Sequence, residues 1–217
     1  MKRAARPTFC ALAAIAAGPA QAATQESQAW ITELATIRID QNDMVTVDAS
    51  QRARGDEASG GEQFLARIAF DHRIAPAVQV GGGFAYLQSE VDKELRPFQQ
   101  VTLAKGIWTA RTRMEQRFFS TANAPGWRLR QRVQAALPVD RAKRWTVIAA
   151  VEVFFQLNRA RPSDKTGLAT VRHQIGLRHP VSRRIDAQLL YMRQQAIRDA
   201  RPDIVSHIPW LTLSWRL

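Results

Sequence analysis

Arginine recurs at every second position in the middle of the chain. Residues 111–117 are Arg-Thr-Arg-Met-Glu-Gln-Arg, and residues 128–132 are Arg-Leu-Arg-Gln-Arg. A β-strand sends alternate side chains to opposite faces, so this spacing predicts two strands that each carry a row of guanidinium groups on one face. Guanidinium groups bind carboxylates and phosphates, and rings of arginine select for anions. The chemistry that these residues offer is therefore anion binding.

The same alternation assigns a larger set of charged residues to one shared inner face, with Asp48 and Asp186 as further inward acids. Two interpretations of this face stay open. The charges could pair with one another and fill a narrow barrel, since buried charges must be paired and hydrogen-bonded. Alternatively, the surplus of arginine could form an anion-attracting pore or pocket. The predicted charge network consists of Arg96, Arg111, Arg113, Glu115, Arg117, Arg128, Arg130, Arg132, Glu152 and Arg172.

Alternating segments of this kind occupy the chain from about residue 28 to its last residue. About ten residues suffice for a tilted strand to cross a bilayer. Tight turns and longer polar loops alternate between the segments, which is typical of an up-and-down antiparallel transmembrane β-barrel that forms a single all-β domain. The segments lie near residues 28–39, 44–53, 62–70, 77–88, 96–104, 107–119, 127–137, 144–157, 167–178, 184–195 and 204–217.

The strand number follows from the expected position of the termini. Both termini of a bacterial barrel normally lie in the periplasm, which requires an even number of strands. We therefore expect either ten strands, with segment 28–39 outside the wall, or twelve, with two segments merged into one.

The second face of each segment is apolar, as contact with lipid requires. A charge that faces lipid at the bilayer midplane of a barrel costs about 2–4 kcal/mol, so the arginines must face the lumen. Aromatic residues near strand ends predict an interfacial girdle of Trp30, Tyr86, Trp108, Trp127 and Trp145. The alternating C-terminal residues Leu213, Trp215 and Leu217 resemble the signal that the barrel-assembly machinery recognises, although the usual last residue is aromatic.

The first 22 residues have the features of a signal peptide. Lys2, Arg3 and Arg6 precede a short apolar run, and cleavage is expected after Ala22, which leaves residues 23–217 as an outer-membrane barrel. The chain has 31 Lys and Arg against 19 Asp and Glu. Export argues against nucleic acid as the acidic partner and favours outer-membrane lipid, lipopolysaccharide and small anionic solutes. The cysteine at position 10 would leave with the signal peptide.

Catalytic motifs are sparse, so we expect no enzyme, no cofactor and no metal site. The four histidines are scattered without metal-ligand spacing. Ser206 and His207 are adjacent, but neighbours on a strand point to opposite faces. Gly81, Gly82 and Gly83 lie within a strand pattern and indicate close packing of the wall. An outer-membrane lipid-modifying enzyme and a soluble periplasmic β-barrel carrier remain as alternatives.

A set of residues from Trp30 onward forms a pattern shared with known proteins. It consists of Arg96 to Gln100, Arg111 to Phe118, Trp127 to Arg132, Glu152 with Phe154 and Phe155, and Tyr191 with Gln194. In these residues the sequence resembles a family of outer-membrane proteins known as domain of unknown function 2490. The resemblance implies an outer-membrane barrel and no established activity.

Overall fold

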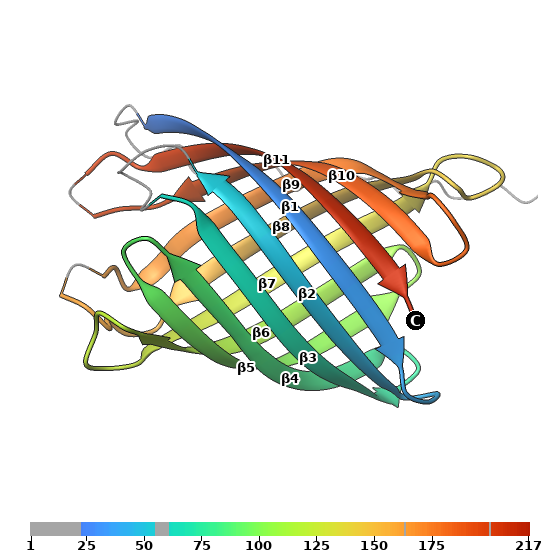
Figure 1. Cartoon of the computed structure of the whole chain (residues 1–217), viewed down its shortest axis with the longest axis horizontal. Coiled ribbons are helices and arrows are strands. Elements are labelled where there is room, and N and C mark those ends of the chain that lie inside the picture. The colour runs from blue at the N-terminus through green and yellow to red at the C-terminus, as the bar shows by residue number, and fades with distance from the viewer. Residues whose placement is uncertain (1–22, 55–60, 163, 200) are drawn as a thin grey trace, which may run out of the picture.

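The computed structural model describes residues 23–54, 61–162, 164–199 and 201–217, and these form a β-barrel. The predicted signal peptide lies outside the described residues. Eleven strands follow one another along the described chain (Figure 1). Their bounds are β1 Thr24–Arg38, β2 Asp43–Arg54, β3 Gln63–Ala75, β4 Val78–Ser89, β5 Lys93–Lys105, β6 Trp108–Phe119, β7 Gly126–Pro138, β8 Thr146–Gln156, β9 Gly167–Pro180, β10 Ile185–Ala196 and β11 Ile204–Arg216.

The barrel closes through a parallel pair of strands, which corrects the predicted even strand number. Each strand pairs antiparallel with the next, whereas β1 pairs parallel with β11, from Thr24 opposite Ile204 to Thr36 opposite Arg216. All eleven predicted segments, the first included, therefore belong to the wall. The even-number rule assumes that both ends of the chain lie at the same end of the barrel. A parallel closing pair places the start of β1 and Leu217 at opposite ends (Figure 1).

The two ends of the barrel carry different connections. One end, called the turn end below, carries connectors 39–42, 76–77, 106–107, 139–145 and 181–184 together with Leu217. The other, called the loop end, carries 55–62, 90–92, 120–125, 157–166 and 197–203 together with the start of β1. At the loop end the amide of Thr24 donates to the carbonyl of Asp203 at 2.8 Å, which ties β1 to the last loop.

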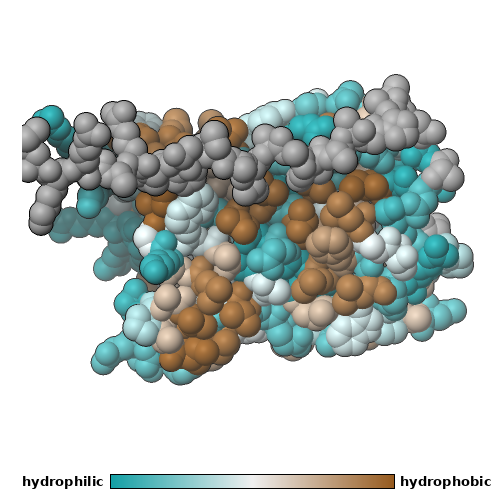
Figure 2. Space-filling view, turned by 180° about the vertical axis from the view of Figure 1, so that it is seen from behind, coloured by the Kyte–Doolittle hydropathy of each residue, from teal (hydrophilic) through white to brown (hydrophobic). Residues whose placement is uncertain are grey.

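Side chains alternate between a polar lumen and an apolar outer surface. On β6, Arg113 and Glu115 are buried inside the barrel, whereas Trp108 and Phe118 are about half exposed on the outside. Figure 2 shows apolar residues gathered over the outer wall and hydrophilic residues at both ends of the barrel. This distribution is opposite to that of most soluble proteins, whose charged residues are mainly exposed.

Close packing of the wall depends on glycine at two positions. A Cβ atom on Gly83 would lie 2.0 Å from the carbonyl oxygen of Ile68, and one on Gly176 would lie 2.0 Å from that of Leu189. Both contacts are far below van der Waals distance, so neither position accepts a side chain without movement of the neighbouring strand.

No helix in the described part of the chain is long and apolar enough to cross a membrane.

Candidate functional site

A polar cavity runs along the inside of the barrel. Its volume is about 660 Å³, and its lining extends from Glu26 and Arg54 near the loop end to Leu34 and Ser214 towards the turn end. Every strand except β4 contributes to the lining, because the strands of a barrel direct alternate side chains inward. The cavity is therefore the lumen itself.

Two buried glutamates organise the arginines of β6 and β7. Glu115 accepts hydrogen bonds from Arg128 Nε and from Arg130 Nη1, both at 2.7 Å. Glu152 accepts from Arg130 Nη2 at 2.8 Å and from Arg111 Nη2 at 3.2 Å, with Arg172 Nη1 at 3.6 Å. Arg130 thus connects both carboxylates. The network forms because the register places residues of three neighbouring strands side by side, as with Arg132 opposite both Arg111 and Glu152.

Smaller charged groups surround this network. Glu94 binds Arg96 and Arg117 near the loop end, and Asp48 accepts from Arg67 Nε at 2.7 Å. Gln100 accepts from Arg113 and donates to Asp71, so the amide connects a cation to a carboxylate. All ten residues of the predicted charge network thus lie in the lumen or bond to residues that do. Asp48 lies there as well, whereas Asp186 binds Arg216 near the turn end.

Cations outnumber carboxylates on the inward face of the described strands. Away from the turn end, eleven inward arginines face six inward acids, and Arg132 makes no ion pair within 4 Å among the described residues. The arginines are Arg52, Arg54, Arg67, Arg96, Arg111, Arg113, Arg117, Arg128, Arg130, Arg132 and Arg172, and the acids are Glu26, Asp48, Asp71, Glu94, Glu115 and Glu152. The lumen therefore carries a net positive charge.

Arg52 is the cation that the internal network compensates least. Nη1 of Arg52 donates to Gln63 at 2.8 Å, whereas Nε has no hydrogen-bond partner. The charges that act most strongly on Arg52 are repulsive and come from Arg172, Arg96, Arg130 and Arg54. In the described chain no carboxylate lies within ion-pair distance of this guanidinium group. Arg52 is thus a half-buried cation without a carboxylate partner.

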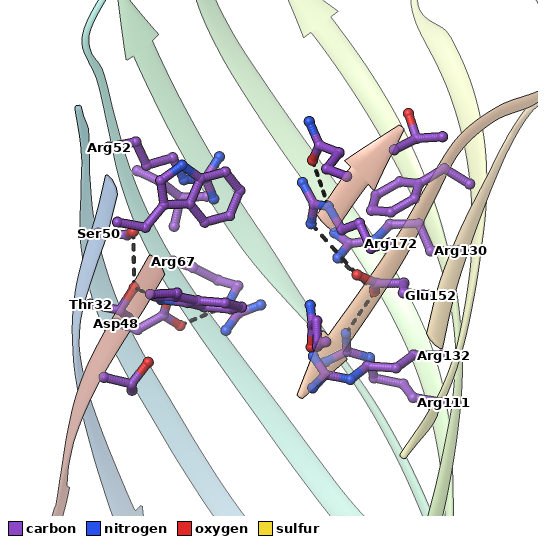
Figure 3. Close-up of a pocket in the computed structure, with 18 of the residues that line it drawn as sticks. Thr32, Asp48, Ser50, Arg52, Arg67, Arg111, Arg130, Arg132, Glu152 and Arg172 are labelled. Atoms are coloured by element: carbon purple, nitrogen blue, oxygen red, sulfur yellow. Dashed lines mark hydrogen bonds and ion pairs between the residues drawn. The ribbon is translucent and has the colours of Figure 1, made fainter. Parts of the chain in front are cut away.

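An indole ring supports Arg52. Its guanidinium carbon lies 4.0 Å from the centre of the Trp30 ring, and that of Arg172 lies 5.2 Å from the same ring. Arg172 also lies 4.7 Å from the ring of Phe154, over which Arg130 packs at 4.6 Å. Figure 3 shows Arg52 and Ser50 on one side of an open space and Arg172 and Arg130 on the other. We call Arg52, Trp30, Arg172, Arg130 and Phe154 the Arg52 site. Its cations and aromatic rings border the same part of the lumen.

The prediction of Trp30 as a girdle residue was wrong. Only 4% of its surface is exposed, and its ring packs edge-on against Trp210 with centroids 5.5 Å apart. The even-numbered residues of β1 face the lumen, as buried Gln28 and Thr32 do. Both faces of β1 mix polar and apolar residues, so alternation in the sequence did not identify the inner one. The other proposed girdle residues, Tyr86, Trp108, Trp127 and Trp145, lie on the outer surface.

Sequence analysis also missed Arg52, Arg54 and Arg67. A signal was present in β2, where Asp48, Ser50, Arg52 and Arg54 alternate with the uncharged residues Ala49, Gln51 and Ala53. β2 and β3 contain fewer arginines than β6 and β7, and pairing of β2 with β3 is what brings Arg67 to Asp48.

The remaining predicted residues have definite positions. Leu213 and Trp215 alternate with the lumen residues Thr212 and Ser214 and so face outward near the turn end, as does exposed Leu217. Ser206 lies in the lumen against Glu26, whereas His207 contacts Tyr191 and Gln25 on the outside. Ser206 and His207 therefore point away from each other. No group of three or more potential metal ligands occurs among the described residues.

Comparison with known proteins finds a family and similar chains. An uncharacterized protein of Methylorubrum extorquens is 29% identical over 228 residues, which cover 98% of both chains. The solved structure of the KdgM porin in complex with disordered oligogalacturonate has a TM-score of 0.48 at 10% identity, over 74% of this chain and 81% of that one. A TM-score this low supports no inference about function. The family model of a protein of unknown function, DUF2490, matches residues 27–205, and the chain therefore belongs to that family.

Proposed function

We propose that this protein is an outer-membrane β-barrel whose lumen binds and admits small organic anions. The observation that carries the proposal is the Arg52 site, where a half-buried cation without a carboxylate partner faces further arginines across an open space. A carboxylate or phosphate in that space would receive charge-assisted hydrogen bonds and relieve the repulsion among the arginines.

The outer surface supports location in a membrane. Ile31, Leu189 and Leu211 are opposite one another on three neighbouring strands, and all of them are exposed. Many other large apolar side chains cover the wall in the same way. Exposed apolar area this extensive is favourable in hydrocarbon and costly in water. A soluble periplasmic carrier would have to leave this surface in contact with water, so the membrane location is preferred.

The lumen supports a role in binding over a purely structural one. A barrel filled by paired charges needs about as many carboxylates as arginines, yet this lumen has a clear excess of arginines. Known small-molecule pockets measure about 300–1,000 Å³. The cavity of about 660 Å³ lies within that range. Its size and charge both suit a small organic anion better than a neutral or cationic solute.

The proposal gives the chain no catalytic role. Ser206 and His207, the adjacent pair that suggested a lipid-modifying enzyme, lie on opposite faces of β11. A nucleophile and its base need to be within hydrogen-bond distance of each other.

Fractionation followed by planar-bilayer recording tests the proposal. Membrane location requires that detergent, and not osmotic shock, releases the protein from cells. Purified protein should then conduct in KCl, and added citrate should reduce the current by occupying the lumen. In the Arg52→Gln variant, a higher citrate concentration should be needed for the same reduction in current. Arg144→Gln, an exposed turn-end variant, is the matched control. A protein that conducts but does not respond to citrate would contradict the anion site.

A further inference from the structure

A row of basic residues crosses the outer surface of β9, β10 and β11, from the middle of β9 to the loop-end part of β10 and β11. His173 on β9, Arg193 on β10 and His207 on β11 are directly opposite one another in the strand register, and Ser27 on β1 follows them. Their chain neighbours Gln174, Gln194, Ser206 and Gln28 line the lumen. Because side chains alternate along a strand, His173, Arg193 and His207 face outward. We call these three residues the basic rung.

The same row is apolar on the neighbouring strands. From His173 the register continues through Val151 on β8, Val133 on β7, Ala110 on β6 and Leu103 on β5. Basic residues in this row therefore occur on adjacent strands only, β9 to β11. Directly opposed residues on antiparallel strands have Cβ atoms about 4.5–5.5 Å apart, so the three side chains can contact one ligand.

Apolar rows lie on the turn-end side of the basic rung. Two residues further towards the turn end on each strand the row is Ile175, Tyr191 and Pro209, and beyond it the row is Leu177, Leu189 and Leu211. On the other side, Arg193 and His207 are close to the loop-end termini of β10 and β11. Tyr191 packs against His207 with ring centroids 6.0 Å apart. Tyrosine is enriched where the hydrocarbon of a bilayer meets its headgroups.

The cations of the basic rung are weakly partnered within the protein. Arg193 Nη1 donates to Gln195 at 3.3 Å and makes no ion pair among the described residues. The ring of His173 has no hydrogen-bond partner there, whereas His207 binds Tyr191 and Gln25. Arg193 is connected to a carboxylate only indirectly, through Gln195, which donates from Nε2 to Asp203 at 2.7 Å. The backbone amide of Arg198 also donates to Asp203, at 3.0 Å. Donors on the basic rung therefore remain available.

We infer that the basic rung binds the phosphate of an anionic lipid headgroup in the leaflet at the loop end. The inference rests on the proposed membrane location, but not on anion transport through the lumen. Arg193 supplies the charge, His173 supplies a ring N–H donor, and the apolar rows below accommodate the acyl chains, whereas both ring nitrogens of His207 are held by Tyr191 and Gln25. Arginine is well suited to phosphate because its planar group donates two parallel hydrogen bonds.

Native mass spectrometry of the detergent-solubilised full chain tests this site. Titration with phosphatidic acid should yield a lipid-bound species that equal amounts of phosphatidylcholine, whose headgroup has no net charge, do not yield. Arg193→Gln should weaken that binding about tenfold, as expected for loss of a charged hydrogen bond. His173→Gln, at an exposed position, should weaken it to a smaller extent and provides a second variant if Arg193→Gln does not fold. Arg144→Gln should bind like the wild type.

Each alternative result overturns the inference. Equal retention of both lipids, or unchanged retention in Arg193→Gln and His173→Gln, would exclude the basic rung as a lipid site. Displacement of the lipid by inorganic phosphate at similar concentration would assign the site to free phosphate. A protein that binds phosphatidic acid as expected but conducts no current would contradict the proposed transport alone.

Discussion

Arg52 and Arg172 approach the same indole ring, with guanidinium carbons 4.0 and 5.2 Å from the centre of Trp30. Two like charges that share one aromatic ring repel each other, and the ring compensates only part of that repulsion. The rest is available to a bound anion. The excess positive charge of the lumen is thus located at Arg52 and Arg172. A barrel filled by paired charges would lead to different predictions.

Loss of a lumen carboxylate should both destabilise the barrel and strengthen its anion preference. Glu152 is 2% exposed and interacts with Arg111, Arg130 and Arg172. Glu152→Gln leaves these cations without their shared partner, which should lower the free energy of unfolding by about 3–5 kcal/mol. Urea titration followed by heat-modifiable gel migration measures this loss. Exposed Glu90→Gln is the control, and equal stability of the two variants would contradict the network described above.

Substitution at Gly83 should prevent correct assembly. Gly83→Ala would place a methyl group 2.0 Å from the carbonyl oxygen of Ile68, so β3 and β4 could not keep their spacing. Gly126→Ala is the matched control, because its new methyl group would lie no closer than 3.4 Å to a neighbour. The fraction of heat-modifiable protein after refolding measures assembly. Normal assembly of Gly83→Ala would show that the two strands are further apart than described.

Three connections at the loop end are joined through Asp92. Its carboxylate accepts from Ser120 at 2.8 Å and from Thr121 at 3.3 Å, and it binds Arg161 of the next loop. Burial raises the pKa of Asp92, but the hydrogen bonds from Ser120 and Arg161 outweigh it, and the pKa is lowered from 3.8. A lowered pKa in the folded state means that the carboxylate stabilises these loops above about pH 4 and ceases to do so as the pH falls through the lowered pKa.

Asp92→Asn should therefore make the loops more susceptible to protease at neutral pH. The difference from wild type should shrink as the pH falls below the ordinary carboxyl range, where Asp92 itself becomes protonated. Limited digestion at several pH values with an acid-tolerant protease measures this. A difference that stays constant down to the lowest pH would mean that the charge of Asp92 does not hold the loops together.

The wall was predictable from the sequence where each strand has one charged and one apolar face. Residues 111–117 and 128–132 identified both the strands and the inward face, because a charge on the apolar face would be costly. The closure was not predictable, since pairing of β1 with β11 joins residues at opposite ends of the chain. Trp30 was misplaced for a related reason. Its lumen position depends on Trp210, Met192 and Ile208, which only closure brings to it.

The zero-current potential of single barrels in a KCl gradient tests the central claim most directly. Because the lumen has an excess of arginine, the zero-current potential should lie between zero and the equilibrium potential of chloride. The double variant Arg52→Gln with Arg172→Gln should move this potential towards zero, whereas Arg144→Gln should leave it unchanged. Cation preference in the wild type, or a potential that does not respond to loss of both lumen arginines, would contradict the account.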